Sequence, residues 1–198
     1  MQTLFLVHYV KLTIITRIAI SELTSIPTTT HIIPVQGQRL VRMELPRPSG
    51  FSQKRSLWVP EDINEVLAGD AHQLGYPDPS MGCRQRFISG IYVTGSMSGD
   101  PDGRKPDFEK LLNVNEVWVM CFRAPRDNQW RLMGRFVGQN SFVGLRLFSR
   151  AFLNGEEHYH KQAESFARDW PETESFLSGA SIKDYISDPV GDPYVPRL

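Results

Sequence analysis

The stretch NQWRLMGRFVGQNSFVGLRLFSR, residues 128–150, decides the fold. Large apolar residues alternate with other residues on both sides of the polar break GQNS at 138–141. A period of two is typical of strands with two different faces, and a short Gly/Asn/Ser break between two such runs is typical of a hairpin. We therefore predict strands over 130–137 and 142–149. Arginines interrupt the aromatic residues in both strands, although a sheet that only built a core would carry Thr, Ser or Lys on its wet side.

The same patterns continue on both sides of this hairpin. A third strand is predicted over 116–123, with short helices before it over 59–75 and 106–113. The charged segment 154–170 predicts a helix with Asn154 as its cap. The sequence therefore predicts an α+β fold, in which an antiparallel sheet of three or more strands has short helices before it and a helix after it.

Two weaker patterns complete the predicted elements. RFISGIYVTG, residues 86–95, is typical of a strand, and the Ser-x-x-Asp spacing of Ser181 and Asp184 predicts a last helical turn over 181–187. Tyr159 and Phe166 belong to an apolar stripe on the predicted helix that also includes Ala163 and Trp170, which we expect to pack in the core.

The domain organisation follows from the proline-rich segments. We expect residues 1–55 to form an N-terminal extension or arm, residues 56–187 a single α+β domain, and residues 188–198 an irregular tail. Residues 1–42 are rich in β-branched residues. Three interpretations stay open: one or two strands, a poorly ordered extension, or a segment upstream of a start at Met43.

The pairing register decides which face of the sheet the arginines occupy, because side chains alternate between faces. A four-residue loop over 138–141 pairs Val137 with Phe142 and leaves one face wholly apolar. A three-residue loop would instead place Arg131 and Arg135 among aliphatic side chains, and burying unpaired cations costs roughly several kcal/mol each. We therefore predict the four-residue loop.

Pairing Arg123 with Trp130 extends this register to the strand over 116–123. The second face then interleaves arginines with rings: Trp118, Met120, Phe122, Arg131, Arg135, Phe142, Arg146 and Phe148. Guanidinium groups clamp phosphates and flat rings stack on bases, so this face suits single-stranded nucleic acid. In a second interpretation residues 156–174 cover the face, and in a third it binds an acidic segment of a partner protein without catalysis.

The charge distribution fits each of these interpretations. The net charge of the chain is zero, but residues 114–150 contain six arginines against two acidic residues. Residues 151–198 contain nine acidic residues against four basic ones. This asymmetry favours either a polyanionic partner for the basic segment or contact between the two segments.

Composition excludes several other classes of protein. The chain has two cysteines, Cys83 and Cys121, which are too few for a disulfide scaffold and favour a cytoplasmic protein. Charged residues interrupt the apolar N-terminal segment, so we expect neither a signal peptide nor a membrane span. No phosphate-binding glycine motif is present, and the His-x-His spacing at 158–160 does not suit a metal on a helix. We expect no cofactor and no metal.

The segment from about residue 106 to 170 resembles the RelE/HigB superfamily of bacterial and phage toxins. Members usually have two longer helices, then a strand ending in an apolar-Arg pair, a strand opening with Tyr/Trp-Arg, a strand ending near Lys/Arg, and a helix. The matching positions here are Phe122-Arg123, Trp130-Arg131 and Phe148-Ser149-Arg150. The resemblance implies an mRNA endoribonuclease, often acting on the ribosome, that an antitoxin protein neutralises.

Cleavage of RNA by attack of a 2′-hydroxyl requires charge stabilisation and proton transfer. Arg131, Arg135 and Arg150 are candidates to stabilise the phosphorane charge, and His158 is the candidate general acid or base. His160 lies about 200° around the helix from His158, so only one of the two faces the sheet; in the alternative, both are solvated surface residues. We assign nucleic-acid contacts to five further residues: Arg123, Arg146, Trp118, Phe122 and Phe148.

Overall fold

The structure is a computed structural model that describes residues 34–35, 38–45, 52–73, 81–97, 106–123, 129–153, 155–171, 175–187 and 190–191. Its strands are β1 (Pro34–Val35), β2 (Gln38–Arg42), β3 (Ser56–Pro60), β4 (Val93–Ser96), β5 (Phe108–Lys110), β6 (Trp118–Phe122), β7 (Trp130–Gly138), β8 (Ser141–Ser149) and β9 (Val190–Gly191). Its helices are α1 (Glu61–Gln73), α2 (Met81–Ser89), α3 (Glu156–Asp169) and α4 (Ile182–Tyr185).

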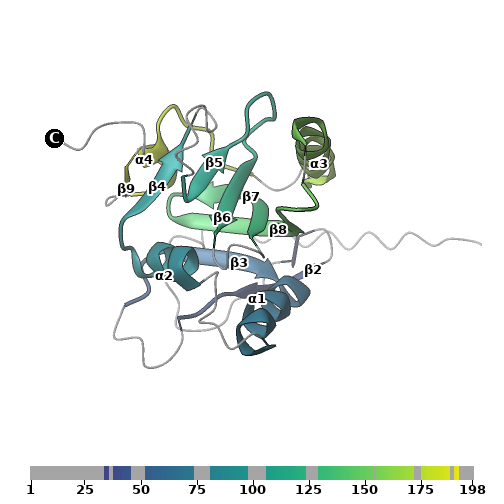
Figure 1. Ribbon diagram of the computed structural model, residues 1–198. Coiled ribbons are helices and arrows are strands. Elements are labelled where there is room, and N and C mark those ends of the chain that lie inside the picture. Colours follow the sequence, from purple (N-terminus) through teal and green to yellow (C-terminus); the bar gives the residue numbers. More distant parts are fainter. Residues whose placement is uncertain are drawn as a thin grey trace, which may run out of the picture.

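The strands form one mixed sheet in the order β1-β2-β3-β8-β7-β6-β5-β4-β9 (Figure 1). Pairing is antiparallel from β5 through β8 and parallel between β3 and β8. Helices α1 and α2 precede the central strands in the chain, and α3 follows them. The predicted α+β class, with helices before and after a largely antiparallel sheet, is confirmed.

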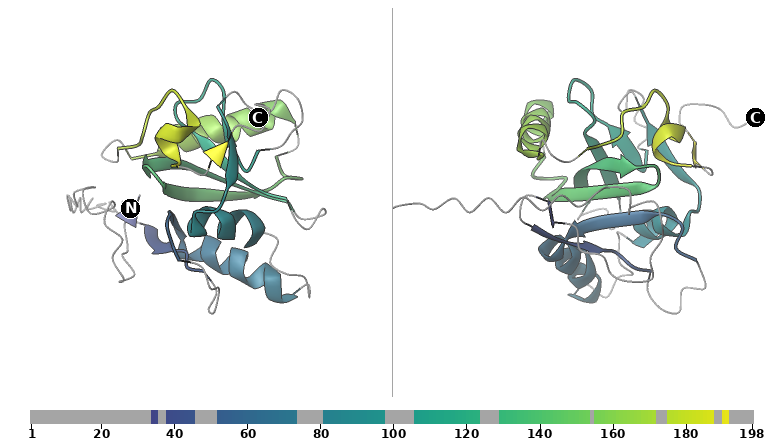
Figure 2. Two further views of the ribbon diagram at one scale, coloured as in Figure 1. Left: turned by 90° about the vertical axis from the view of Figure 1, so that its left-hand side faces the viewer. Right: turned by 180° about the vertical axis from the view of Figure 1, so that it is seen from behind.

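Each face of the sheet carries its own core. On one face, α1, α2 and α4 pack against rings and aliphatic side chains of the central strands, among them Phe108, Trp118, Phe122 and Phe136. On the other face, α3 packs against Val119, Met133 and Val143, among others. Figure 2 shows α3 on the opposite side of the sheet from α1 and α2.

The β7–β8 hairpin is confirmed, but its turn differs from the prediction. Gly138 pairs with Ser141, so the turn has two residues, and Asn140 adopts a left-handed φ of 66° that asparagine tolerates. Two bulges, at Val137 and at Leu145, each insert one extra residue. Between Arg131 and Met133 the predicted pairing is correct; between the bulges the register is shifted by one.

The predicted register between β6 and β7 is wrong by one residue. Trp130 pairs with Phe122 and not with Arg123. A one-residue slip exchanges the faces of a strand. The rings of β6 therefore lie on the face opposite to Arg131, and the face that we predicted to interleave arginines with Trp118 and Phe122 does not form.

Several element boundaries also differ. The helix predicted over 59–75 and the last turn over 181–187 are confirmed by α1 and α4, and Ser181 and Asp184 form a capping box at α4. Residues 86–95 divide between the end of α2 and the strand β4, and residues 106–113 contain the strand β5 where we predicted a helix. Short segments such as these take their conformation from the neighbours they pair with.

The structure includes part of the predicted N-terminal arm in the sheet. Strand β2 pairs with β3, and both Leu40 and Met43 are buried. The N-cap of α3 is Gly155, so the prediction that Asn154 caps this helix is wrong. Residues 1–33 and residues 192–198 lie outside the described residues. No helix in the described ranges is both long and apolar enough to span a membrane.

Candidate functional site

Arg131, the first residue of the candidate site, lies at the end of the β7–β8 hairpin opposite to the turn. It pairs with Phe148 across β7 and β8, on the face that α3 covers. Its Nη1 donates to the backbone oxygens of Trp130 at 3.0 Å and Phe122 at 3.3 Å. Within the described ranges no carboxylate lies within salt-bridge distance of Arg131.

Arg150 follows directly after β8 and is exposed. Its backbone N–H donates to Gln129 O at 2.7 Å, and its Nη1 donates to Gln129 Oε1 at 2.8 Å. These two bonds close the open end of the hairpin and hold the side chain near the start of β7. In the part of the chain that the structure describes, Arg150 also has no carboxylate partner.

A series of three rings continues from this pair of arginines toward α3. Phe148 stacks on Phe152 with centroids 5.7 Å apart and ring planes 3° apart. His158 meets Phe152 edge-on at 4.9 Å. The Phe152 side chain is 53% exposed, and His158 Nε2 is buried with no hydrogen-bond partner among the described residues. We call Arg131, Phe148, Arg150, Phe152 and His158 the ring–arginine site.

The two histidines separate as the helical geometry predicts. His158 contacts the ring series, whereas His160 pairs with Glu164 at 3.2 Å on the exposed side of α3. Between them, Tyr159 packs against the core, and burial raises its pKa well above the ordinary value. Ala163, Phe166 and Trp170 are buried as well, so the predicted core role of this stripe is confirmed.

Arg135 does not join the ring–arginine site. It is 3% exposed, and its Nη2 donates to Asn115 O at 3.0 Å. Its Cζ lies 4.0 Å from the ring centroid of Phe176 and 5.0 Å from that of Trp170. Burial lowers its pKa to about 10, and Glu116 opposes this shift. Because aromatic side chains enclose Arg135, its guanidinium group cannot contact a substrate phosphate in this structure, and the expected catalytic role is wrong.

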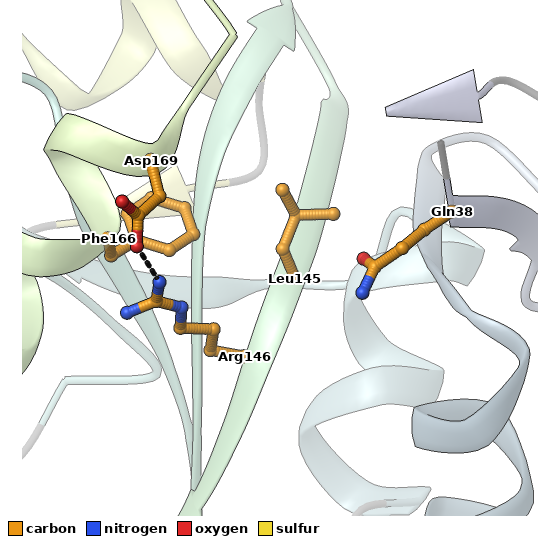
Figure 3. Close-up of a pocket in the computed structure, with 5 residues that line it drawn as sticks. All are labelled: Gln38, Leu145, Arg146, Phe166 and Asp169. Atoms are coloured by element: carbon orange, nitrogen blue, oxygen red, sulfur yellow. Dashed lines mark hydrogen bonds and ion pairs between the residues drawn. The ribbon is translucent and has the colours of Figure 1, made fainter. Parts of the chain in front are cut away.

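The Arg146 side chain interacts with residues of α3. It pairs with Asp169 (Figure 3). Its Nη1 also donates to Ser165 Oγ at 3.3 Å. Its Cζ also lies 5.9 Å from the ring centroid of Phe166. The interpretation in which the helix after the sheet covers the arginine face is therefore confirmed for Arg135 and Arg146, and it fails only at the open end of the hairpin.

The aromatic residues of β6 cannot stack on bases. Trp118 and Phe122 are fully buried against the opposite helices, because β6 pairs one residue out of the predicted register. Arg123 donates from Nη2 to Pro106 O. The side chains of Trp118 and Phe122 therefore lie on the face opposite to the ring–arginine site, although the Phe122 carbonyl accepts a hydrogen bond from Arg131. Of the five predicted nucleic-acid contacts, the site retains Phe148.

Sequence analysis missed Phe152. It lies in the turn between β8 and α3, where neither the strand pattern nor the helix pattern predicts the direction of a side chain. In the sequence, only its spacing of four residues from Phe148 indicates that the two rings could meet. The stacking of the two rings depends on the reversal of the chain after Ser149, whose Oγ accepts a hydrogen bond from the Phe152 N–H at 3.2 Å.

The chemistry available at the ring–arginine site is that of an anion site beside an aromatic surface. The described residues contain no group of three His, Cys, Asp or Glu side chains that could hold a metal. Two guanidinium groups can bind a phosphate, an exposed phenyl ring can stack on a base, and an imidazole can transfer a proton. No protein-family model, no curated protein and no solved structure matches this chain.

Proposed function

We propose that this protein is an RNA-cleaving toxin similar to RelE and HigB, with the ring–arginine site as its active site. The order of elements from β6 onward supports the proposal, because β6, β7 and β8 are followed by the helix α3, as the resemblance implies, whereas β4 and β5 stand between α2 and β6. Its expected setting is the cytoplasm, with mRNA, often on the ribosome, as substrate and an antitoxin protein as the neutralising partner.

One observation carries the proposal: Arg131 and Arg150 have no carboxylate partner among the described residues, although α3 beside them is rich in acidic residues. A structural arginine next to an acidic helix usually pairs with it, as Arg146 does with Asp169. Two cations without such a partner, beside an exposed ring stacked on a second ring, fit a phosphodiester whose neighbouring base stacks on Phe152.

The proposed reaction uses the RNA's own 2′-hydroxyl. Its oxygen attacks the adjacent phosphorus while the bond from phosphorus to the 5′-oxygen breaks, which leaves a 2′,3′-cyclic phosphate and a 5′-hydroxyl. Arg131 and Arg150 stabilise the charge that develops on the phosphorane oxygens. His158 transfers one of the two protons, from the 2′-hydroxyl or to the 5′-oxygen, and water exchanges the other.

The test compares wild type with the double variant Arg131→Ala/Arg150→Ala. We expect induced wild type to arrest bacterial growth and to cleave mRNA, and the double variant to do neither at a matched protein level. Purified protein should produce 2′,3′-cyclic phosphate ends from a single-stranded RNA, and His158→Ala should lower the rate by roughly 10²-fold or more with RNA binding retained.

A charge-matched control is Lys161→Ala/Arg168→Ala, which removes two exposed cations from α3. It should retain cleavage, and its RNA affinity should keep the salt dependence of wild type. For the Arg131/Arg150 variant, the slope of log affinity against log salt concentration should become shallower by about 0.7 for each phosphate contact that is lost. A folded wild type that neither binds nor cleaves RNA would exclude the proposal and favour a non-catalytic module that binds an acidic protein segment.

A further inference from the structure

The sheet has an open slot beside the second half of β8. Strand β3 pairs with β8 only from Ser56 to Trp58, opposite Ser141 to Val143, and ends at Pro60 where α1 begins. From Gly144 onward β8 has β7 on one side and, among the described strands, none on the other. The start of β2 lies across this gap, and Figure 3 shows Gln38 of β2 facing Leu145 of β8.

Two hollows that share Leu145 and Arg146 in their lining lie beside this part of β8. One, of about 190 Å³, lies between Gln38, Arg146 and Asp169. The other, of about 430 Å³, lies between α1, β8 and α3. Both are lined by Leu145, the extra residue of the bulge in β8. We call the two hollows together the edge groove.

The floor of the larger hollow is mainly apolar. Ile63 and Val66 of α1 face Leu145 and Leu147 of β8, with Trp130 beside them. Val66 is 40% exposed although it sits among these apolar side chains. Four of these five side chains are aliphatic, so the floor suits aliphatic residues of a ligand better than the flat face of a base.

The backbone of β8 adds a second kind of recognition. In an antiparallel pair, every second residue directs its N–H and C=O away from the partner strand. Along Leu145 to Phe148 these outward groups point to the side where the described residues supply no strand. An extended chain in the edge groove would pair with them, which is how peptides add to sheet edges.

Charge at the rim distinguishes a peptide from a nucleic acid. Asp62 of α1 and Asp169 of α3 flank the groove, and both carboxylates are exposed. Arg146 already pairs with Asp169, and in the described ranges Asp62 has no ion pair. The rim is therefore net acidic, which repels phosphates and favours a lysine or arginine on the ligand.

We propose that the edge groove binds an extended segment of a partner protein that adds a strand to β8. The segment carries aliphatic side chains at alternate positions, which enter the hollow between α1 and β8, and a lysine or arginine that pairs with Asp62. The proposal stands independently of RNA cleavage. It also gives the partner access to the ring–arginine site, because Phe148 lines the groove and stacks on Phe152.

The test is selection from a displayed library of nine-residue peptides on the full chain, with the Val66→Lys chain as the counter-selected bait. We expect enriched peptides with alternating aliphatic residues and a flanking basic residue, and at least tenfold weaker binding of the best peptide to Val66→Lys. Ile91→Lys, at an apolar position of similar exposure away from the groove, should bind like wild type. Asp62→Asn should weaken only peptides that carry the basic residue.

Backbone pairing is tested with the best peptide and its N-methylated form. We expect N-methylation of every second residue to abolish binding, and the bound peptide to slow amide exchange in residues 145–148 of the full chain. Three results would overturn the proposal: equal binding by the methylated peptide, exchange in 145–148 that is already slow in the free chain because the chain itself fills the groove, or protection of 145–148 by a single-stranded RNA and not by peptides.

Discussion

The two ends of β7 each carry an arginine, but one arginine is buried in the core and the other is partly exposed. Near the turn, Arg135 is 3% exposed and enclosed by Phe176, Trp170 and Phe166. Four residues earlier, Arg131 is on the same face, half-buried, and bonded only to backbone oxygens. The comparison shows that the spacing of arginines in a strand does not predict their surroundings: α3 and the segment after it enclose Arg135 in the core and leave Arg131 without an aromatic enclosure.

The largest effect is expected from Arg135→Ala, which removes the side chain at the centre of the aromatic enclosure. The variant leaves a cavity and an unpaired Asn115 oxygen, so we expect a loss of about 2–4 kcal/mol in the free energy of unfolding, measured by urea denaturation. Arg135→Met should lie within about 1 kcal/mol of wild type, because the enclosing rings accept an apolar chain of similar volume without its desolvation cost. A loss equal to that of the alanine variant would show that the cation itself stabilises the fold.

An intermediate effect is expected from Glu116, which lies next to the loop carbonyl that Arg135 uses. Burial by itself raises the Glu116 pKa, but hydrogen bonds from Lys110, Tyr185 and Ser178 outweigh it, and the pKa lies below its usual value. A lowered pKa in the folded state stabilises the protein above the unfolded-state pKa, and this contribution is lost as the pH falls through the folded-state pKa.

We therefore expect the wild type to lose stability as the pH falls below about 4.5, the ordinary pKa of a glutamate side chain. Glu116→Gln should lose about 1–2 kcal/mol at pH 7 and show a flatter dependence on pH in this window. Denaturation curves of both proteins at several pH values measure this difference. Equal pH slopes for the two proteins would assign the acid sensitivity to other carboxylates.

The smallest effect on stability is expected from Arg131→Ala. This side chain is half-buried and contributes two hydrogen bonds to backbone oxygens, so its removal should cost less than about 1 kcal/mol. The same variant should weaken the binding of a single-stranded RNA by at least tenfold. If instead Arg131→Ala destabilises the protein as much as Arg135→Ala does, the contrast between the two ends of β7 is wrong and Arg131 is structural.

Local sequence was sufficient for the elements that have strong periodicity or explicit end signals. The alternation in residues 130–149 predicted β7 and β8, and the Ser181/Asp184 spacing predicted the turn of α4. Within the candidate site, Arg131, Phe148, Arg150 and His158 were predicted from their residue types and positions. Arg131 pairs with Phe148, Arg150 follows at the end of the same strand, and His158 contacts the ring of Phe152 that stacks on Phe148. Their chemical roles remain proposals that the experiments above test.

The predictions that failed were the register between β6 and β7 and the part of the β7–β8 register that lies between the two bulges. Phe122 was placed beside the arginines because we paired Arg123 with Trp130, and the true partner is one residue away. The glycines of the hairpin explain part of this difficulty: a Cβ on Gly134 would lie 2.1 Å from Val143 O, so the close approach at the bulge requires glycine there. A glycine in a strand indicates such an irregularity without specifying which residue becomes the extra one.

The sequence by itself determined the period of β6, β7 and β8, the positions of α1 and α3, and the residue types found at the end of the hairpin, because these depend on neighbours a few residues apart. The tertiary structure alone decided the bulges, the pairing of β6 with β7, and which arginines α3 covers. Those features depend on packing between segments far apart in the chain, where a shift of one residue exchanges the buried and the exposed face.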